Sequence, residues 1–328
     1  MTDNTQRSLI DQLESAVEKM LRGEPVVLAP DPAMGTLMGF ASDLRDLPRE
    51  SFLARLGQEL NEEGENMLAT EKEVREGFRT VTPYVVTKQV SAIAEFLKQA
   101  FNAVETFASP APGSGGGYHF EFRVGHSMLM VGGATNYPGP EITPSLHYFV
   151  NDVDAAYRQA IAAGATSLHE PVDQPYGVRE ASVGFVGTEW YLSTPMKDAK
   201  GRETLSVGDL ALYLHPKGAR DMIDFMKRAF GAEEVEVYRE PAGSGPIVHA
   251  KVRIQDSIVE LGEAHGQYQP KPSMFFLYVD DADAWFNRAV SAGAQVSTPM
   301  GDQPYGRTGA VQDPHGNLWH VCTPAEAK

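Results

Sequence analysis

The sequence predicts an α+β protein made of two tandem copies of one structural unit, preceded by a helical segment. Residues 145–195 align without a gap with residues 274–324 at an offset of 129, with 18 identities in 51 positions. Within each copy, one strand, one helix and about three strands occur twice in the same order. A constant offset through strands, helices and turns indicates one unit of roughly 125 residues that is used twice.

The helical segment is expected at residues 1–78, which have no copy elsewhere in the chain. Leu9, Leu13, Val17 and Leu21 fall at four-residue spacing, as on one face of a helix. Short helices bury little apolar surface alone, so this segment is expected to dock on a repeat or on a second subunit, giving a homo-oligomer. A regulatory role is the alternative.

The repeats are expected at residues 79–199 and 205–328, joined by the polar connector KDAKGRE. The first repeat places its helices at SAIAEFLKQAF and VDAAYRQAIAAGA, and the second at RDMIDFMKRAFGA and ADAWFNRAVSAGA. Strand segments such as VTPYVV, YHFEFRV and SMLMVGG surround them. Two such halves per repeat predict a cupped antiparallel sheet with its helices on the outer face. The repeated pentapeptide DQPYG is expected to build a loop.

Alternation along the strands indicates a polar face opposite the helices. Two strands place histidine and charge on that face: His119, Glu121 and Arg123 in one, and His249, Lys251 and Arg253 in the other. Pairing across the turn at Gln255 should set Lys251 opposite Glu260. Further ring-bearing residues share the face: Tyr84, His147, Phe149, Tyr213, Phe276, Tyr278 and His320. A half-aromatic, half-polar concave face predicts a small-molecule site, and a plain solvated sheet is the alternative.

Composition limits the function. The net charge of −16 argues against nucleic acid and anionic membranes as partners. The chain shows no signal peptide at its start and no apolar run of membrane-spanning length. Cys322 is the only cysteine, which suits a reducing cytoplasm.

Several strings resemble the vicinal oxygen chelate superfamily, which groups glyoxalases, bleomycin-resistance proteins and extradiol dioxygenases. They are IDFMKRAFGAEEV, IVHAKVRIQDSIVELGE, FLYVDDADAWFNRAVSAGA and DPHGNLWHVCTP. The resemblance covers about residues 79–325 and is closest to the PhnB-like branch. It implies paired βαβββ modules that form a cup, often around a divalent metal that chelates neighbouring substrate oxygens. It does not fix the reaction, because one fold hosts many functions.

The resemblance also implies positions for metal ligands on the first, fourth, fifth and last strands. In the second repeat these positions carry Ala211, Glu260, Met274 and His320, and in the first they carry Thr82, Met130, Ser145 and Tyr191. A divalent metal (Fe, Zn, Ni or Mn) is therefore expected only in the second repeat, on Glu260 and His320. If halves pair across the repeats instead, these two residues fall in different cups.

Two functions remain open. One is a metal-assisted lyase, isomerase or dioxygenase with the second repeat active and Glu260, His320 and His249 as catalytic residues. The other is a metal-free protein that sequesters a drug or antibiotic. Under either, the expected substrate-binding residues are Tyr213, Lys251, Arg253, Phe276, Tyr278, His119, Glu121 and His147.

Overall fold

Four βαβββ modules form the fold of the computed structural model, which describes residue 75 and residues 77–110, 117–136, 138–174, 177–196 and 205–325. Module 1 contains β1 (Val81–Val86), α4 (Val90–Phe101), β2 (Val104–Pro110), β3 (Tyr118–Val124) and β4 (Ser127–Gly133). Module 2 contains β5 (Ser145–Phe149), α5 (Val153–Ala162), β6 (Thr166–Asp173), β7 (Val178–Phe185) and β8 (Thr188–Pro195). Module 3 contains β9 (Leu210–Leu214), α6 (Ala219–Phe230), β10 (Glu233–Arg239), β11 (Ile247–Ile254) and β12 (Ser257–Leu261). Module 4 contains β13 (Met274–Tyr278), α7 (Ala282–Ser291), β14 (Gln295–Gln303), β15 (Gly306–Gln312) and β16 (Leu318–Pro324).

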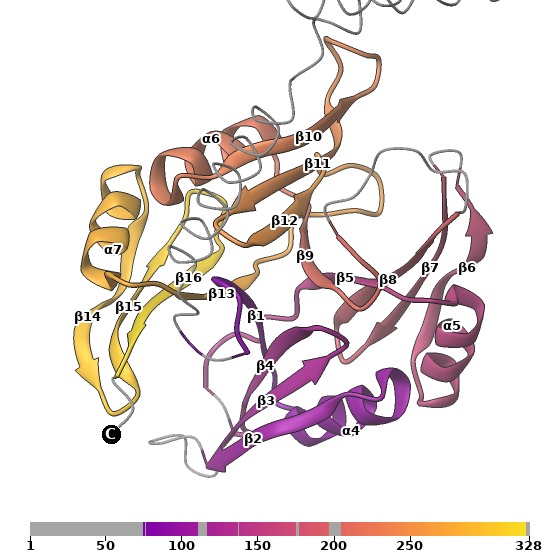
Figure 1. Cartoon of the computed structure of the whole chain (residues 1–328), viewed down its shortest axis with the longest axis horizontal. Helices are drawn as coiled ribbons and strands as arrows, with labels where there is room; N and C mark the ends of the chain where they lie inside the picture. Colours follow the sequence, from indigo (N-terminus) through magenta and orange to yellow (C-terminus); the bar gives the residue numbers. More distant parts are fainter. Residues whose placement is uncertain are drawn as a thin grey trace, which may run out of the picture. The chain divides into compact units, whose positions relative to one another are not determined.

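The modules pair across the sequence repeats (Figure 1). Modules 1 and 4 form one eight-stranded sheet, in the order β14-β15-β16-β13-β1-β4-β3-β2, which we call the 1/4 sheet. Modules 2 and 3 form the other, β10-β11-β12-β9-β5-β8-β7-β6, called the 2/3 sheet. The expectation that the second repeat builds a cup of its own is therefore wrong. Its stated alternative, pairing of halves across the repeats, is the observed arrangement.

The α+β class with two modules per cupped sheet is confirmed, although each sheet is mixed rather than wholly antiparallel. In every module the first and fourth strands pair in parallel, as β1 does with β4 and β5 with β8. The modules of each sheet meet through antiparallel first strands, β1 with β13 and β5 with β9. Each cup therefore has first and fourth strands at its centre, and side chains from both repeats meet there.

Helices cover the convex side of each sheet and also join the modules of one repeat. Contacts connect α4 with α5 and α6 with α7. Phe96 of α4 stacks on Phe185 of β7 at 4.2 Å, and Phe230 of α6 lies 4.5 Å from the ring centroid of Trp319 in β16. Burial of these large rings contributes apolar stabilisation between the modules of each repeat. Strand pairing thus joins the two repeats, whereas helix packing joins the modules within each.

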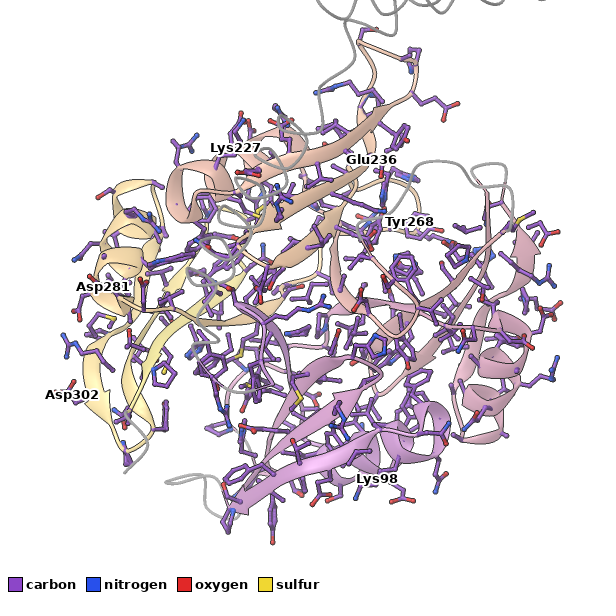
Figure 2. The ribbon with its side chains drawn as sticks, in the orientation of Figure 1. Lys98, Lys227, Glu236, Tyr268, Asp281 and Asp302 are labelled. Carbon is purple, nitrogen blue, oxygen red and sulfur yellow. The ribbon has the colours of Figure 1, made fainter. Side chains whose placement is uncertain are left out.

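The helices begin and end where their sequences predict. Asp152 and Asp281 each accept a hydrogen bond from the backbone N–H three residues on, at 2.9 Å, which caps α5 and α7. Gly164 and Gly293, the glycines of the two AGA strings, follow with φ of 97° and 110°, a left-handed conformation that glycine adopts without steric cost. The helix faces that point away from the sheets are solvated, as Figure 2 shows for Lys98 of α4 and Lys227 of α6.

In the described part of the chain, the repeated DQPYG string forms ion pairs with the strand that follows it. Its aspartates, Asp173 and Asp302, pair with Arg179 at 2.7 Å and Arg307 at 3.2 Å on the following strands. Both arginines also bind the first-turn aspartate of the nearby helix.

Among the described helices, none has the length and apolar character needed to cross a bilayer. The predicted helices of residues 1–78 and their role in oligomers lie outside the described residues, except for the end of that segment from Arg75 on.

Candidate functional site

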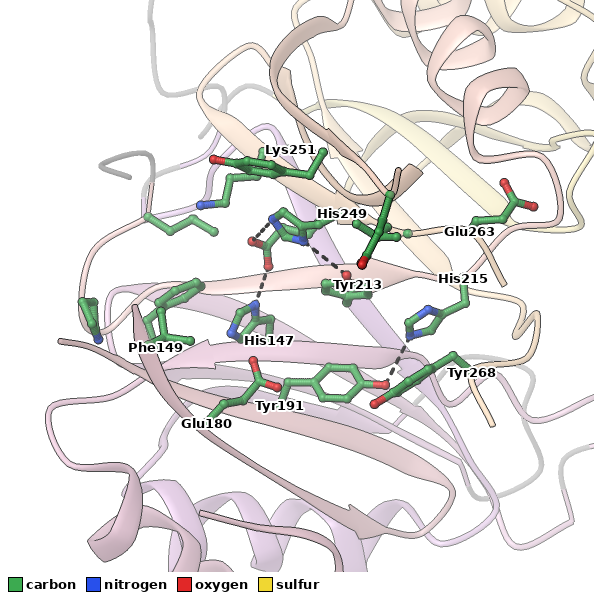
Figure 3. A pocket seen from close by; sticks show the side chains of 18 of the residues that line it. His147, Phe149, Glu180, Tyr191, Tyr213, His215, His249, Lys251, Glu263 and Tyr268 are labelled. Carbon is green, nitrogen blue, oxygen red and sulfur yellow. Dashed lines mark hydrogen bonds and ion pairs between the residues drawn. The ribbon is translucent and has the colours of Figure 1, made fainter. Parts of the chain in front are cut away.

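A cavity of about 1060 Å³ opens in the cup of the 2/3 sheet (Figure 3). Its floor consists of the central strands β5, β8, β9 and β12, and β7 and β11 form its sides. Strand alternation turns His147, Tyr191, Tyr213 and Glu260 onto this concave face, away from the helices. The volume suits a small organic molecule, and the lining mixes aromatic rings with a few charged groups.

The floor of the cavity contains a buried ion pair between the two repeats. His147 Nδ1 lies 2.6 Å from Glu260 Oε2, and its Nε2 lies 2.7 Å from Ser193 Oγ. Ser193 in turn donates to Glu180 Oε2 at 3.3 Å. A protonated His147 satisfies this chain, because it donates to Glu260 and to Ser193 at once.

The electrostatics of the pair favour the charged forms of both groups. Burial lowers the pKa of His147, but the adjacent Glu260 carboxylate outweighs burial and the net pKa is raised. Burial likewise raises the pKa of Glu260, but the charge and hydrogen bond of His147 hold it below its ordinary value. Each group therefore stabilises the charge of the other, as expected for opposite charges in a low-dielectric site.

Among the described residues, none forms a hydrogen bond with the second oxygen of Glu260. Oε1 is buried without one, and the nearest cation-capable atom is His249 Nε2 at 3.8 Å. His249 Nδ1 lies 3.2 Å from the hydroxyl of Tyr213, and burial lowers the pKa of His249, which favours the neutral ring. A neutral ring that accepts from Tyr213 carries its proton on Nε2, the atom facing Glu260. A buried, unsatisfied carboxylate oxygen is costly in a native structure and indicates a place where a donor binds.

Beside this pair, Lys251 lies opposite Glu260 in the register, as the turn at Gln255 predicted. Its side chain is only 7% exposed, and its ammonium lies 3.6 Å from Glu236 Oε2. The floor thus carries both signs of charge within one small area.

An aromatic wall closes the other side of the cavity. The ring of His215 stacks on Tyr268 at 5.1 Å, and Tyr191 lies 5.5 Å from Tyr213. The hydroxyl of Tyr191 lies 3.2 Å from His215 Nε2. Burial raises the pKa of Tyr191, with the charge of Glu189 adding to it, so the phenol stays protonated and donates to Glu189 Oε2 at 3.4 Å. Flat rings of this kind provide stacking surface for a planar ligand.

Burial of His215 predicts acid sensitivity. Burial lowers its pKa to about 4, and nearby His265 and Lys271 lower it while Glu189 raises it. Because the unfolded ring has a pKa near 6.5, the unfolded state binds more protons as the pH falls below that value. The neutral ring should therefore cost up to about 3 kcal/mol of stability between pH 6.5 and 4. Urea unfolding of wild type and His215→Phe over this range should show a shallower loss in the variant, and parallel curves would contradict this prediction.

The cup of the 1/4 sheet repeats this geometry with different side chains. Phe276 and His320 pair in its register as His147 and Tyr191 do in the 2/3 sheet, and Met130 stands beside Tyr84 as Glu260 stands beside Tyr213. The hydroxyl of Tyr84 also lies 3.0 Å from His119 Nδ1, matching Tyr213 and His249. An apolar cluster fills the centre of this cup: Phe78, Met128, Met130, Phe276, Tyr278 and Cys322.

These positions divide the expected site residues into two sets. The 2/3 cup contains Glu260, His249, Tyr213, Lys251 and His147. The 1/4 cup contains His320, Phe276, Tyr278, His119 and Glu121. The expectation that Glu260 and His320 act at one centre is wrong, because these residues belong to different sheets. His320 stacks on Phe276 at 5.8 Å, and burial lowers its pKa to about 4.

One expected binding residue lies away from both cups. The side chain of Arg253 is half exposed at the end of β11, where it pairs with Glu233 at 2.5 Å. Its predicted role in the cavity is therefore wrong. Strand alternation placed it on the correct face but could not show that the cavity stops before it.

Sequence reasoning did not select Glu180, Ser193, His215 and Tyr268 as site residues. Two of them were accessible to it by alternation, because His215 lies two residues after Tyr213 and Ser193 two residues after Tyr191. Tyr268 lies in the loop between β12 and β13, for which no periodic pattern exists. On β5 it is His147, two residues from the expected Ser145, that stands opposite Ala211 in the register.

Paired βαβββ modules around an aromatic and polar cup define a class of small-molecule-binding proteins. The model of the Glyoxalase/Bleomycin resistance protein/Dioxygenase superfamily matches residues 79–193 and 216–321, and the chain belongs to this family. An uncharacterized protein of Mycobacterium tuberculosis is 37% identical over 127 residues, which cover 35% of this chain and 74% of that protein. The resemblance to the PhnB-like branch stays a prediction.

Two solved structures are similar over most of the chain. Glyoxalase I from Zea mays is 12% identical with a TM-score of 0.57, covering 74% of this chain and 92% of that one. A putative dioxygenase from Bacillus subtilis is 12% identical with a TM-score of 0.51, covering 74% and 83%. At these identities the similarity concerns the fold alone.

Members of this superfamily commonly use a divalent metal, but the donor set of the 2/3 cup does not fit one in the observed arrangement. His147 is committed through both nitrogens to Glu260 and Ser193, which leaves His249 and one carboxylate oxygen. The described residues contain no group of three histidine, cysteine or acidic side chains arranged to hold a metal ion. A catalytic metal normally keeps three protein ligands. The predicted site on Glu260 and His320 is excluded by their separation into two sheets.

Proposed function

We propose that the protein binds a small, planar organic molecule in the 2/3 cup, and that the ligand presents an N–H or O–H group toward Glu260. The observation that carries this proposal is the cavity of about 1060 Å³, whose floor contains a buried carboxylate oxygen that has no hydrogen-bond partner in the described part of the chain. The rings of Tyr191, Tyr213 and Tyr268 supply stacking surface beside it.

The path from the cavity to this oxygen passes His249. Its side chain is 25% exposed, with Nδ1 3.2 Å from the hydroxyl of Tyr213 and Nε2 3.8 Å from Glu260 Oε1. A ligand donor that enters between His249 and Glu260 satisfies the buried carboxylate oxygen. The lowered pKa of Glu260 keeps the acceptor ionised at neutral pH.

A matched pair of probes tests this proposal. 2-Naphthol offers a flat ring with one O–H donor, and 2-methoxynaphthalene has the same ring without the donor. A hydrogen bond to a charged acceptor contributes about 1.5–3 kcal/mol, so 2-naphthol should bind the wild type at least about tenfold more tightly by isothermal titration calorimetry.

The variants locate the binding. Glu260→Met, which installs the residue that the 1/4 cup has at this position, should abolish the preference for the hydroxyl compound. His320→Gln, in the other sheet, should leave it unchanged. Equal affinity of the two probes for the wild type, or equal loss in both variants, would contradict the proposal.

An acid–base enzyme is the second candidate, and the hydrogen-bonded series from Glu260 through His147 and Ser193 to Glu180 favours it. Such a series can exchange a proton between a buried carboxylate and the cavity edge. The test is exchange of the acidic C–H protons of phenylacetone in deuterated water, followed by proton NMR. Exchange that requires Glu260 and Ser193 would support catalysis, whereas a bound ketone without accelerated exchange would support binding alone.

A further inference from the structure

The centre of the 1/4 cup is occupied by side chains of the chain's own segment before β1. Arg75 forms an ion pair with Glu121 Oε2 at 2.7 Å and hydrogen-bonds the hydroxyl of Tyr278. Its guanidinium lies 4.1 Å from the ring centroid of Phe78, which packs edge-on against Tyr278 at 5.2 Å. The flat guanidinium of Arg75 thus lies among aromatic rings and one carboxylate. The cup around it has the same arrangement of strands as the 2/3 cup.

Glu121 is built into the cup as an anion. The residue is 5% exposed, and its second oxygen lies 3.3 Å from His119 Nε2, while the hydroxyl of Tyr84 lies 3.0 Å from the other ring nitrogen. Burial raises the pKa of Glu121, but hydrogen bonds from His119 and Arg75 hold it below its ordinary value. A buried carboxylate without a cation is strongly unfavourable, so the cup favours binding of another cation when Arg75 leaves.

The contacts that Arg75 makes with described residues of the cup come from its side chain. The guanidinium-bearing side chain is 32% exposed. Among its described backbone neighbours, the carbonyl of Arg75 accepts one hydrogen bond, from Phe78 N–H at 2.9 Å, and the two residues form an isolated bridge outside both sheets. The occupant of the cup is therefore not fixed by strand pairing.

We propose that the 1/4 cup is a second binding site, specific for a small organic cation of the amidinium or guanidinium type attached to an apolar or aromatic body, and that Arg75 occupies it as an internal ligand. The cation pairs with Glu121 and Tyr278. The apolar body packs on Met128, Met130 and Phe276, where the cluster supplies no charge. This site is independent of the function proposed for the 2/3 cup.

The corresponding position of the 2/3 cup shows why the two sites differ. The pairs Tyr84 with His119 and Tyr213 with His249 occupy equivalent places, and two residues along the strand Glu121 corresponds to Lys251. The 1/4 cup therefore carries a carboxylate at the position where the 2/3 cup carries an ammonium group paired with Glu236.

The test uses the full chain with benzamidine, a flat aryl cation, and benzamide, its neutral counterpart of the same shape. Benzamidine should bind Arg75→Ala at least about tenfold more tightly than the wild type by ligand-observed NMR or calorimetry, because it no longer competes with the internal arginine. The wild type should still bind it weakly. Benzamide should bind neither protein better than the other.

Two further variants fix the location. In a Glu260→Met background, which removes the acceptor that the 2/3 cup offers to N–H donors, Glu121→Gln should remove benzamidine binding, both with Arg75 present and combined with Arg75→Ala. Since Glu121→Gln is also tested with Arg75 present, the proposal stays falsifiable if Arg75→Ala fails to fold. Three results would overturn it: equal binding of benzamide, binding that survives Glu121→Gln, or no binding to the wild type at about a hundred times the dissociation constant of the variant. The last result would mean that Arg75 is a fixed structural residue that no ligand displaces.

Discussion

Replacement of His147 by alanine should destabilise the protein by about 3–5 kcal/mol, because it leaves the Glu260 carboxylate buried without its counter-charge. Glu260 is fully buried, and its bond to His147 is the one hydrogen bond that its two oxygens have among the described residues. Urea unfolding at pH 6 would measure the loss.

The 1/4 cup supplies the matched control. The double variant His147→Phe/Glu260→Met carries the pair that Phe276 and Met130 form at the equivalent positions, so no charge is buried. Apolar replacement of a complete buried ion pair is often neutral or stabilising, and the double variant should therefore recover most of the stability lost in His147→Ala. A double variant as unstable as the single one would show that the loss comes from packing.

The same pair predicts a dependence of stability on pH above 6.5. The pKa of His147 is raised in the folded state, so its contribution is complete below the unfolded value near 6.5 and is lost as the pH rises through the folded value. The lowered pKa of Glu260 has the opposite sense, and its contribution is lost only as the pH falls through the folded value. The double variant should lack the loss of stability above pH 6.5 that His147 contributes.

Separation of the two repeats should abolish folding of either one as a monomer. The fragments 73–199 and 200–328 each hold two modules, but every sheet needs its β1–β13 or β5–β9 contact between the fragments. Each fragment alone exposes the edges of two first strands, and open edges of this kind associate with other chains. Circular dichroism and size-exclusion chromatography should show unfolded or self-associated fragments and a folded one-to-one complex after co-expression. A folded monomer from either fragment would contradict this prediction.

The sequence predicts the strands and helices of each module well because the patterns that determine them are local. Strand alternation, helix periodicity and caps such as Asp152 act over a few residues, and the turn at Gln255 sets the register of Lys251 against Glu260. The internal repeat predicts that the pattern occurs twice.

The pairing of modules could not be predicted in this way. The first strands β1, β5, β9 and β13 are all short and apolar, so pairing within a repeat and pairing across repeats satisfy the same pattern. The candidate site inherits this ambiguity, because Glu260 meets His147 only if β9 pairs with β5. Ser145 and His147 share one face of their strand, so alternation could not distinguish them either. Arg75 lies outside any repeated element, and only the structure brings it to Glu121.

The crossed pairing of modules has a consequence for how such a protein diverges. Each cup takes one wall from the first half of the chain and the other wall from the second half. A recombination event that exchanged one complete repeat with a relative would therefore produce two hybrid pockets rather than transfer one intact specificity. To move a binding site as a unit, the exchange must carry the two central modules together, which form one continuous stretch from β5 to β12, or else the two outer ones, which lie at opposite ends of the sequence. The 2/3 cup is thus the site that a single contiguous exchange can transfer intact.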